Sequence, residues 1–452
     1  MTPFKLSDQL IEEIELLIES KNDTALQNMF GEFHYADVAE IIHELNLEEA
    51  TYIIKLLESD KTSDVLAELD EDVREQILEN MSAKEIAEEL GELDTDDAAD
   101  IIAELSRERA QEVIAQIEDE EHAKDIVELL RYDENSAGGL MAKELVKVNE
   151  NWNVLKCVKE MRIQAEHVTR VHSIYVVDDD EKLKGRLSLK DLLTTSTKTQ
   201  ISEVYIPKVD YVKVTDKAEE VAKLMQKYDL EAVPVVDELG RLAGRITIDD
   251  IVDVIKEEAD KDYQLAAGIT QEVEADDSII ELTRARLPWL VLGLIGGLGS
   301  VFILEGFEEI MVNPSYRGLF FYTPLIAAMA GNVGVQSSAI IVQGLANDVV
   351  KGSLLNRLVK EVSLTLINGS VLACLIVIFG FLMDNPINFS LTIAISMMTV
   401  IVVAALIGTF IPIILHKKGI DPAIATGPFI TTSNDIFGIF LFFYIAKLIL
   451  GF

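Results

Sequence analysis

Apolar positions follow two different patterns along this chain, with the change near Arg284. Before it, up to about residue 130, apolar residues recur at spacings of three and four with few Gly or Pro, which predicts amphipathic helices. After it, long apolar stretches predict membrane spans at 287–307, 318–345, 358–383, 390–415 and 424–450, each able to cross about 30 Å of hydrocarbon. The pattern therefore predicts a multidomain membrane protein.

Three segments in the first part repeat one short amphipathic pattern. They read DVAEIIHEL from Asp37, DVLAEL from Asp64 and AADIIAEL from Ala98. Imperfect repetition of this kind is typical of helical hairpins that bury one another's apolar stripes. We expect residues 1–135 to form an all-α superhelical domain with acidic outer faces.

A second repeat begins near Gly138 and keeps a register of 59 positions. VVD recurs from Val176 and Val235, and Gly-Arg recurs at Gly185 and Gly244. Each unit reads strand, helix, VVD strand, turn, a Gly-Arg segment that ends in Ser/Thr-x-x-Asp, and a helix. Residues 136–199 and 200–256 thus resemble a tandem pair of α/β CBS domains.

The CBS resemblance implies a nucleotide site and a dimer. In that family the Ser/Thr and Asp often hold the ribose of an adenine nucleotide, so Ser188, Asp191, Thr247 and Asp250 are candidate contacts for ATP. The competing interpretation is that Ser/Thr-x-x-Asp caps the helix that follows. Dimerisation through the CBS pair is the safer inference.

Residues 257–283 link the soluble part to the membrane part. The stretch 251–280 is charged and predicts one long helix that runs to the first span. It is expected to act as a connecting, or plug, helix. The five spans then form a transmembrane domain over residues 284–452.

Charge divides between the same two parts. The whole chain holds 39 Lys plus Arg and 78 Asp plus Glu, whereas residues 284–452 hold only 9 and 8 of them, so the acidic excess precedes Arg284. Such a region repels nucleic acid and concentrates cations. Nucleic acid is therefore not an expected partner, whereas divalent cations and membrane lipids are.

Loop charges predict the orientation in a cell (inner) membrane. Arg284 and Arg286 precede the first span, Lys351, Arg357 and Lys360 follow the second, and His416, Lys417 and Lys418 follow the fourth, whereas the other loops carry Arg317. The chain also opens without a signal-peptide pattern. We expect a cytosolic N-terminus and an extracytoplasmic C-terminus at Phe452. Cys157 and Cys374 then lie on different sides of the topology, and a disulfide framework is not expected.

Asp435 is the residue with the clearest functional implication. It is an acid well inside the last apolar stretch, where an ionised group costs at least about 2.5 kcal/mol unless it faces a polar cavity, a partner or an ion. Mg²⁺ prefers oxygen ligands and sheds its waters reluctantly. Asp435 is therefore a candidate ligand for a hydrated cation.

Two sequence motifs in the apolar part of the chain bear on this interpretation. The second span contains PLIAAMAGNVGVQSS from Pro324, and the fifth contains DPAIATGPFITTSND from Asp421. With the domain order above, they resemble the MgtE family of magnesium channels. The resemblance implies Mg²⁺ uptake by a homodimer, with Asp435 as the main ion ligand and Asn332 as a pore or packing neighbour. Gly331, Gly334, Gly427 and Pro428 are expected to line the pore, and Gly293 and Gly297 to pack helices.

The resemblance also implies closure by cytosolic Mg²⁺ bound to acids of the N domain, the CBS pair and the connecting helix. Asp96 with Asp100, and Glu258 with Asp262, are four residues apart and share one helical face. Glu219, Asp229 and Asp250 match further acidic positions of the family. Lys217 and Lys261 stand where relatives can carry acids, so a direct salt bridge is an alternative to one ion.

Other protein classes make different demands on the sequence. A CBS-bearing intramembrane protease needs His-Glu-x-x-His, and His43-Glu44 has no second histidine at that spacing, so an enzyme is not expected. An anion channel would direct helix N-termini at its substrate, and a membrane carboxylate favours cations. A broader Mn²⁺ or Co²⁺ transporter and a CBS-regulated receptor or scaffold remain alternatives.

Overall fold

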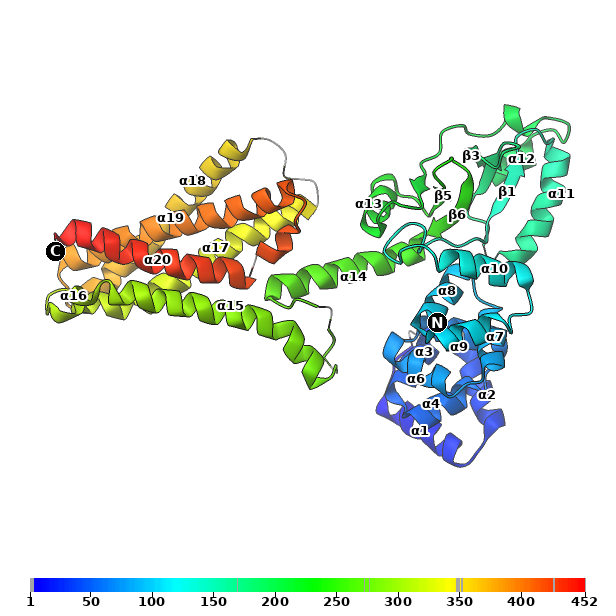
Figure 1. The fold of residues 1–452 in the computed structure, drawn as a ribbon, viewed down its shortest axis with the longest axis horizontal. Helices are drawn as coiled ribbons and strands as arrows, with labels where there is room; N and C mark the ends of the chain where they lie inside the picture. Colours follow the sequence, from blue (N-terminus) through cyan, green and yellow to red (C-terminus); the bar gives the residue numbers. More distant parts are fainter. Residues whose placement is uncertain are drawn as a thin grey trace. The chain divides into compact units, whose positions relative to one another are not determined.

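The computed structural model describes residues 4–168, 170–271, 273–275, 277–346, 350, 353–425 and 427–451. The chain forms two compact units, residues 1–256 and residues 257–452 (Figure 1). Three residues used in the sequence interpretation, Lys351, Thr426 and Phe452, lie outside the described residues.

Short helices form the first part of unit 1. They are α1 (Asp8–Glu19), α2 (Asp23–Glu32), α3 (Tyr35–Glu44), α4 (Leu47–Ile54), α5 (Ser59–Glu68), α6 (Glu71–Glu79), α7 (Ala83–Leu90), α8 (Thr95–Glu104), α9 (Arg107–Ile114) and α10 (Glu120–Leu129). Polar caps such as the capping boxes of Asn46 and Ser82 begin several of them. α3 packs on α5, α5 on α7, and α8 on α10. The predicted superhelical stack of helices is confirmed.

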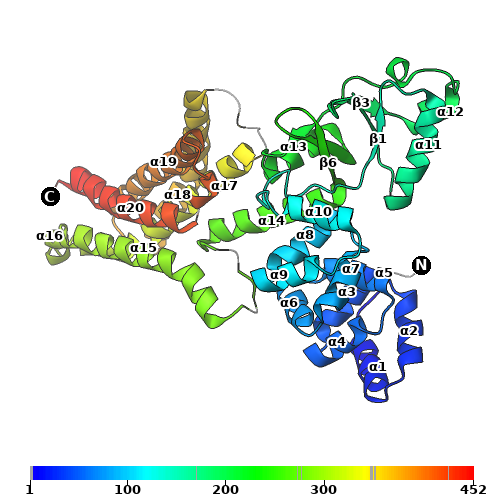
Figure 2. The same ribbon diagram turned by 45° about the vertical axis from the view of Figure 1, so that its right-hand side comes forward.

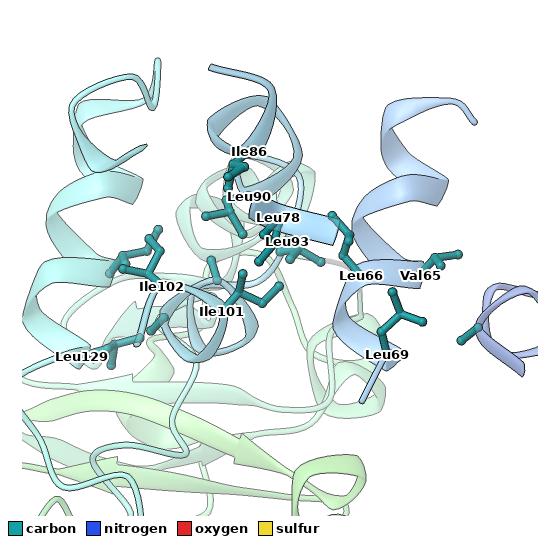
Figure 3. Close-up of a cluster of buried hydrophobic side chains, with 14 of the residues drawn as sticks. Val65, Leu66, Leu69, Leu78, Ile86, Leu90, Leu93, Ile101, Ile102 and Leu129 are labelled. Carbon is teal, nitrogen blue, oxygen red and sulfur yellow. The ribbon is translucent and has the colours of Figure 1, made fainter. Parts of the chain in front are cut away.

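The apolar faces of these helices meet in one interior. Figure 3 shows Leu66, Leu90, Ile101 and Leu129, contributed by α5, α7, α8 and α10, and all are at most 2% exposed. The three repeated sequence segments are α3, α5 and α8. Each repeat therefore supplies a helix whose apolar stripe is covered by a neighbouring helix.

Two similar α/β units complete unit 1. The first contains β1 (Val146–Asn149), α11 (Val154–Gln164), β2 (Ile174–Val177), β3 (Leu183–Leu187) and α12 (Leu189–Thr194), and the second contains β4 (Val212–Lys213), α13 (Ala218–Tyr228), β5 (Ala232–Val236), β6 (Leu242–Thr247) and the start of α14 (Ile248–Ala267). In each, the first strand pairs parallel and the third antiparallel to the middle strand. The register shifts at Val176/Val177 and at Val235/Val236, which are equivalent positions. The repeat read from the sequence is thus a repeat of backbone geometry.

The helix predicted over 251–280 is shorter than expected. α14 ends at Ala267, and Gly268 follows with a φ of +82°, a conformation that ends helices. A new helix, α15 (Ile279–Glu305), begins at a capping box made by Ser278 and Glu281. The prediction of one continuous helix into the membrane is therefore wrong. The first long apolar helix begins before residue 284.

Unit 2 contains helices long and apolar enough to cross a membrane at all five predicted spans. These ranges are Ile279–Glu305, Arg317–Ala346, Leu354–Leu382, Ile387–Lys417 and Gly427–Leu450. They correspond to α15, to a 3₁₀ turn (Arg317–Tyr322) followed by α17 (Thr323–Ala346), to α18 (Leu354–Leu382), to α19 (Ile387–Lys417) and to α20 (Gly427–Leu450), with the short α16 (Glu308–Val312) after α15. α17 packs on α19 and α20, α18 on α19, and α15 on α20, as Figures 1 and 2 show.

Small residues let these helices approach closely. A Cβ built on Gly408 of α19 would lie 2.3 Å from the carbonyl oxygen of Gly334, and one on Gly296 of α15 would lie 1.8 Å from Cγ2 of Thr432. A Cβ on Gly293 or Gly297 meets nothing within 4 Å in this chain. In the first span the close contact is thus made by Gly296 and not by the predicted pair, Gly293 and Gly297.

Candidate functional site

A cavity of about 410 Å³ lies between α17 and α20. Its lining comes from one face of each helix: Ala327, Ala328, Gly331, Asn332, Val335, Gln336, Thr431 and Asp435. Asp435 and Asn332, the two membrane residues predicted as ion contacts, thus lie on one cavity. Gln336 and Thr431 were part of the recognised motifs but were not assigned, and they add an amide and a hydroxyl to the same wall.

The spacing of α17 and α20 follows from two glycines. A Cβ on Gly331 would lie 3.3 Å from Cγ2 of Thr431 and 3.8 Å from Oδ1 of Asp435. A Cβ on Gly334 would lie 1.8 Å from Nδ2 of Asn434. Gly331 lines the cavity as predicted, whereas Gly334 is buried against α19 and α20 and makes a packing contact instead of a pore wall.

A second carboxylate lies inside a candidate span and was not assigned from the sequence. Glu361 of α18 accepts a hydrogen bond of 2.5 Å from Oγ of Ser337 on α17. Ser337 is 4% exposed. This pair joins α17 to α18, and neither residue lines the cavity. Asp435 is therefore not the only acid at membrane depth.

The first turn of α20 contacts the end of α14. Gly427 has a φ of +28°, and a Cβ built there would lie 2.1 Å from the carbonyl oxygen of Ala266. A Cβ on Gly268 would likewise lie 2.4 Å from Cγ of Pro428. Gly427 and Pro428, predicted to line the pore, make a packing contact with the connecting helix. This contact joins that helix to the helix that carries Asp435.

In unit 1 the carboxylate oxygens of Asp94, Asp96 and Glu144 lie within 4.8 Å of one another. Glu144 also accepts hydrogen bonds from the backbone and hydroxyl of Thr95, and Asp94 is paired with Arg245 at 3.2 Å. We call these three acids the acid cluster. Asp94 and Glu144 were missed because only their separation in space, not their sequence spacing, places them beside Asp96.

The acids of α8 destabilise one another's charge. Asp96 is 8% exposed, and burial together with the charges of Asp97 and Asp250 raises its pKa well above the ordinary value. Loss of hydration, reinforced by the charge of Asp250, raises the pKa of Asp97 and Asp100 to about 7. The charge of Asp250 therefore raises the pKa of both Asp96 and Asp100, which couples these predicted residues through Asp250.

Asp250 also caps α14. Its Oδ2 accepts hydrogen bonds from the backbone N–H and the hydroxyl of Thr247, at 3.0 and 2.8 Å. Burial raises its pKa to about 6 although these hydrogen bonds oppose that change. In the first CBS unit, Ser188 caps α12 through the N–H of Lys190. The cap is thus made by the hydroxyl of Ser188 in the first unit and by the carboxylate of Asp250 in the second, and a nucleotide contact would be an additional role.

The other predicted metal residues are not gathered into one site. Glu219 is paired with Lys223 at 2.6 Å, and Asp229 ends α13 with a φ of +50°. Glu258 is paired with Lys261 at 3.4 Å, the direct salt bridge that the sequence offered as an alternative to one ion. Asp262 lies on the next turn of the same helix.

Buried polar groups without a partner mark a second position between the CBS units. The hydroxyl of Tyr175 and Nε of Arg245, on residues 1% and 5% exposed, have no hydrogen-bond partner among the described residues, and neither has Nδ1 of His172. Burial and the positive charge of Arg245 lower the pKa of His172, whereas burial raises the pKa of Tyr175 to about 12. Donors around a guanidinium fit an anionic ligand.

Three family models match the chain. The MgtE intracellular N domain matches residues 33–135, the CBS domain matches residues 137–197 and 201–257, and MgtE, a divalent cation transporter, matches residues 323–445. The last match includes every residue that lines the cavity.

Curated relatives and solved structures agree with these matches. Magnesium transporter MgtE of Thermus thermophilus is 35% identical over 325 residues, 71% of this chain and 72% of the relative, and that of Bacillus subtilis is 34% identical over 70% of each chain. The cytosolic domain of the Mg²⁺ channel MgtE in complex with ATP covers 54% of this chain and 99% of that chain, with 34% identity and a TM-score of 0.51. The soluble part of a magnesium transporter gives 28% identity and a TM-score of 0.50.

Proposed function

The chain belongs to the MgtE family of multi-pass membrane transporters, which are not enzymes, and on that premise we propose that it admits Mg²⁺ to the cell through the cavity beside Asp435. The observation that carries the proposal is the arrangement of one carboxylate, two amides and a hydroxyl on a cavity of about 410 Å³. A Mg²⁺ ion with six waters occupies on the order of 200 Å³, given a Mg–O distance of about 2.1 Å. The cavity thus suits an ion that keeps its water.

Asp435 supplies the charge that attracts the ion, and the carboxamide oxygens of Asn332 and Gln336 supply neutral acceptors for the O–H groups of its water shell. Outer-shell contacts of this kind select for the hydrated ion's size and charge without removing its waters. An alternative cargo is a broader set of divalent ions, including Mn²⁺ and Co²⁺. Two copies of the chain facing one another would place two Asp435 carboxylates on one path, which is why we propose a homodimer.

The proposed orientation places residues before α15 in the cytosol, because Arg284 and Arg286 lie near the start of α15, ahead of its apolar stretch, and Arg317 lies in an opposite loop. The acidic unit then faces the compartment that receives Mg²⁺. This arrangement suits negative feedback by the transported ion.

We propose that cytosolic Mg²⁺ closes the pathway through the acids of unit 1. Two unit charges about 4 Å apart repel by roughly 4 kcal/mol at an effective dielectric of 20, and a divalent ion between them removes that repulsion. The acid cluster, with Asp100 and Asp250 nearby, supplies such pairs. Closure then reaches the pore through α14, whose end contacts Gly427.

An adenine nucleotide is the proposed second regulator. The unpartnered groups of Tyr175, Arg245 and His172 support an anionic ligand between the CBS units, and a structure 34% identical to this chain was solved with ATP. Ser188, Asp191, Thr247 and Asp250 stay candidates for the ribose. Calorimetric titration of ATP into the native chain and the Asp191→Ala variant tests this role, and equal affinities would exclude Asp191 from the site.

The transport proposal is tested by Mg²⁺ influx into liposomes that contain the purified chain. The native chain should admit Mg²⁺, and Asp435→Asn should abolish influx because the amide keeps the shape but not the charge. Asp384→Asn is the matched control, since Asp384 is exposed, lies outside the cavity and has a φ of +55° that Asn tolerates. Influx that survives Asp435→Asn would exclude this site as the pathway, and absence of influx in the native chain would contradict transport.

A further inference from the structure

The carboxamide of Asn434, in the first half of α20, is buried without a hydrogen-bond partner among the described residues. The residue is 1% exposed, and neither Oδ1 nor Nδ2 of its carboxamide has a partner among the described residues. Buried polar groups in native proteins are almost always paired, so an unpaired one calls for a specific physical reason. An apolar side chain of similar size would fill this position at lower cost.

The neighbours of Asn434 place it beside the ion site. A Cβ on Gly334 would lie 1.8 Å from Nδ2 of Asn434 and 2.8 Å from Cγ2 of Ile430. Gly331, three residues earlier on α17, faces Thr431 and Asp435 in the same way. The face of α20 that carries Thr431 and Asp435 therefore lies over Gly331 and borders the cavity. The adjacent face, which carries Ile430 and Asn434, lies over Gly334 and is buried.

A rotation of α20 about its axis exchanges the positions of these two faces. Successive residues of a helix point about 100° apart, so a rotation of that size brings Asn434 to the position that Asp435 holds here, and a smaller one brings both side chains to the cavity edge. Gly334 and Gly331 present backbone and no side chain to the rotating face of α20. At these two positions the exchange therefore meets backbone and no side chain of α17.

Two features at the ends of this region favour such a movement. Gly427, the first residue of α20, has a φ of +28° and contacts the carbonyl of Ala266, so a shift of the connecting helix acts directly on the base of α20. On the opposite side, Pro412 lies inside α19 and has no N–H for the carbonyl of Gly408, whose Cα packs on Gly334. The crossing of α19 with α17 at Gly334 thus holds a backbone acceptor that lacks its usual helical donor.

We propose that Asn434 is a further contact for the hydrated divalent cation, sealed in this conformation and turned into the cavity when α20 rotates. Its carboxamide oxygen then accepts hydrogen bonds from the ion's water shell beside the Asp435 carboxylate. The unmet hydrogen bonds destabilise the sealed conformation and so favour the conducting one. The inference rests on the proposed transport function, because it assigns a further residue to the same pathway.

Asn434→Leu tests the energetic half of this inference. Leucine fills the same space without polar atoms, so it stabilises the sealed conformation and should lower Mg²⁺ influx at low cytosolic Mg²⁺ by about tenfold or more while it raises the melting temperature. Asn434→Ser keeps a polar group and should retain more influx than leucine. Ile430→Leu, which alters the same crossing without changing polarity, is the matched control and should leave influx within about twofold.

Cysteine labelling tests exposure without relying on transport. In Asn434→Cys, a charged methanethiosulfonate should modify position 434 in the presence of a chelator and not in millimolar Mg²⁺, with the label located by peptide mass spectrometry. Asp435→Cys is the positive control because it lines the cavity, and Ile439→Cys, 5% exposed, is the buried control.

If position 434 stays unlabelled in chelator, the inference is overturned even if the native chain transports Mg²⁺. The same holds if Mg²⁺ influx is unchanged in Asn434→Leu. A native chain that admits no Mg²⁺ would refute the transport function, and the labelling would still decide whether Asn434 reaches water.

Discussion

Arg245 of β6 donates to Asp94 at the start of α8 across 3.2 Å, and this ion pair joins the second CBS unit to the helical N domain. The Arg245 side chain is 6% exposed and that of Asp94 28%. Asp94 is at the same time one of the three acids whose oxygens lie within 4.8 Å of one another. The guanidinium is therefore a fixed counter-charge for a cluster that otherwise repels itself.

Arg245→Ala should destabilise unit 1 in the absence of divalent ions. Removal of the guanidinium leaves Asp94 beside Asp96 and Glu144 without its paired cation, which should cost about 2 kcal/mol, below the range for fully buried pairs because Asp94 is partly exposed. Chelator-treated protein should therefore melt earlier than the native chain. Millimolar Mg²⁺ should restore more stability to the variant than to the native chain.

The double variant separates this electrostatic effect from lost packing. Asp94→Asn removes one repelling charge, so Arg245→Ala combined with Asp94→Asn should cost less than the sum of the two single changes. Strict additivity of the three melting shifts would show that the ion pair has no energetic role.

Acidity should stabilise the ion-free protein. Asp97 and Asp100 have a pKa of about 7 in the fold against an ordinary value of 3.8, so the folded chain binds more protons than the unfolded chain between about pH 4 and pH 7. Stability therefore falls as pH rises through that window and levels off above it. Melting temperatures of the full chain in chelator should decline from about pH 5 to pH 7.5.

The combined variant Asp97→Asn with Asp100→Asn should flatten this pH dependence, because it removes the two carboxylates whose protonation differs between the states. A melting temperature that rises over the same window would contradict the assigned direction. Added Mg²⁺ should oppose the decline most strongly at the upper end, where the carboxylates are ionised.

Two substitutions of Asp250 separate its cap from its charge. Asp250→Asn keeps an oxygen for the N–H and hydroxyl of Thr247, whereas Asp250→Ala removes it, so only the alanine should lose the roughly 1 kcal/mol of a helix cap. Both remove the charge that raises the pKa of Asp97 and Asp100. If the charge serves Mg²⁺ sensing, both variants should need more Mg²⁺ to reduce influx, and equal sensitivity in all three proteins would leave Asp250 with capping alone.

Local patterns predicted the elements of this fold because each element is encoded locally. The spans followed from uninterrupted apolar stretches, and the two CBS units from a repeat that the structure reproduces down to the bulges at Val176/Val177 and Val235/Val236. The exception was 251–280, where charge periodicity continued past Gly268 although its positive φ ends the helix. The conformation of one glycine thus ended a helix that the charge pattern predicted to continue to residue 280.

Residues that depend on packing between helices were harder to predict. Asp435 was found because an acid in an apolar stretch is anomalous by itself, and Asn332 because its motif was recognised. Glu144 and Asp94 carry no such local signal, since their importance comes from meeting Asp96 in space. Likewise, the pattern identified Gly334 as a special position, but only the structure shows that it faces Asn434 and Gly408 and not the cavity.

Gly334→Ala should damage the membrane domain far more than Gly331→Ala, although both are mid-helix glycines of one motif. A Cβ on Gly334 would lie 1.8 Å from Nδ2 of Asn434, whereas the nearest atom to a Cβ on Gly331 is 3.3 Å away. The first must displace the buried side chains of Asn434 and Ile430 or move α20, at a cost of roughly 1–3 kcal/mol, while the second needs only a small adjustment. Gly297→Ala, where a Cβ meets nothing within 4 Å, is the control and should be neutral or slightly stabilising, because alanine favours a helix over glycine. The measurement is thermal unfolding of the detergent-solubilised chain together with Mg²⁺ influx, and similar losses for Gly334→Ala and Gly331→Ala would contradict the close approach of α17 and α20 on which the ion site depends.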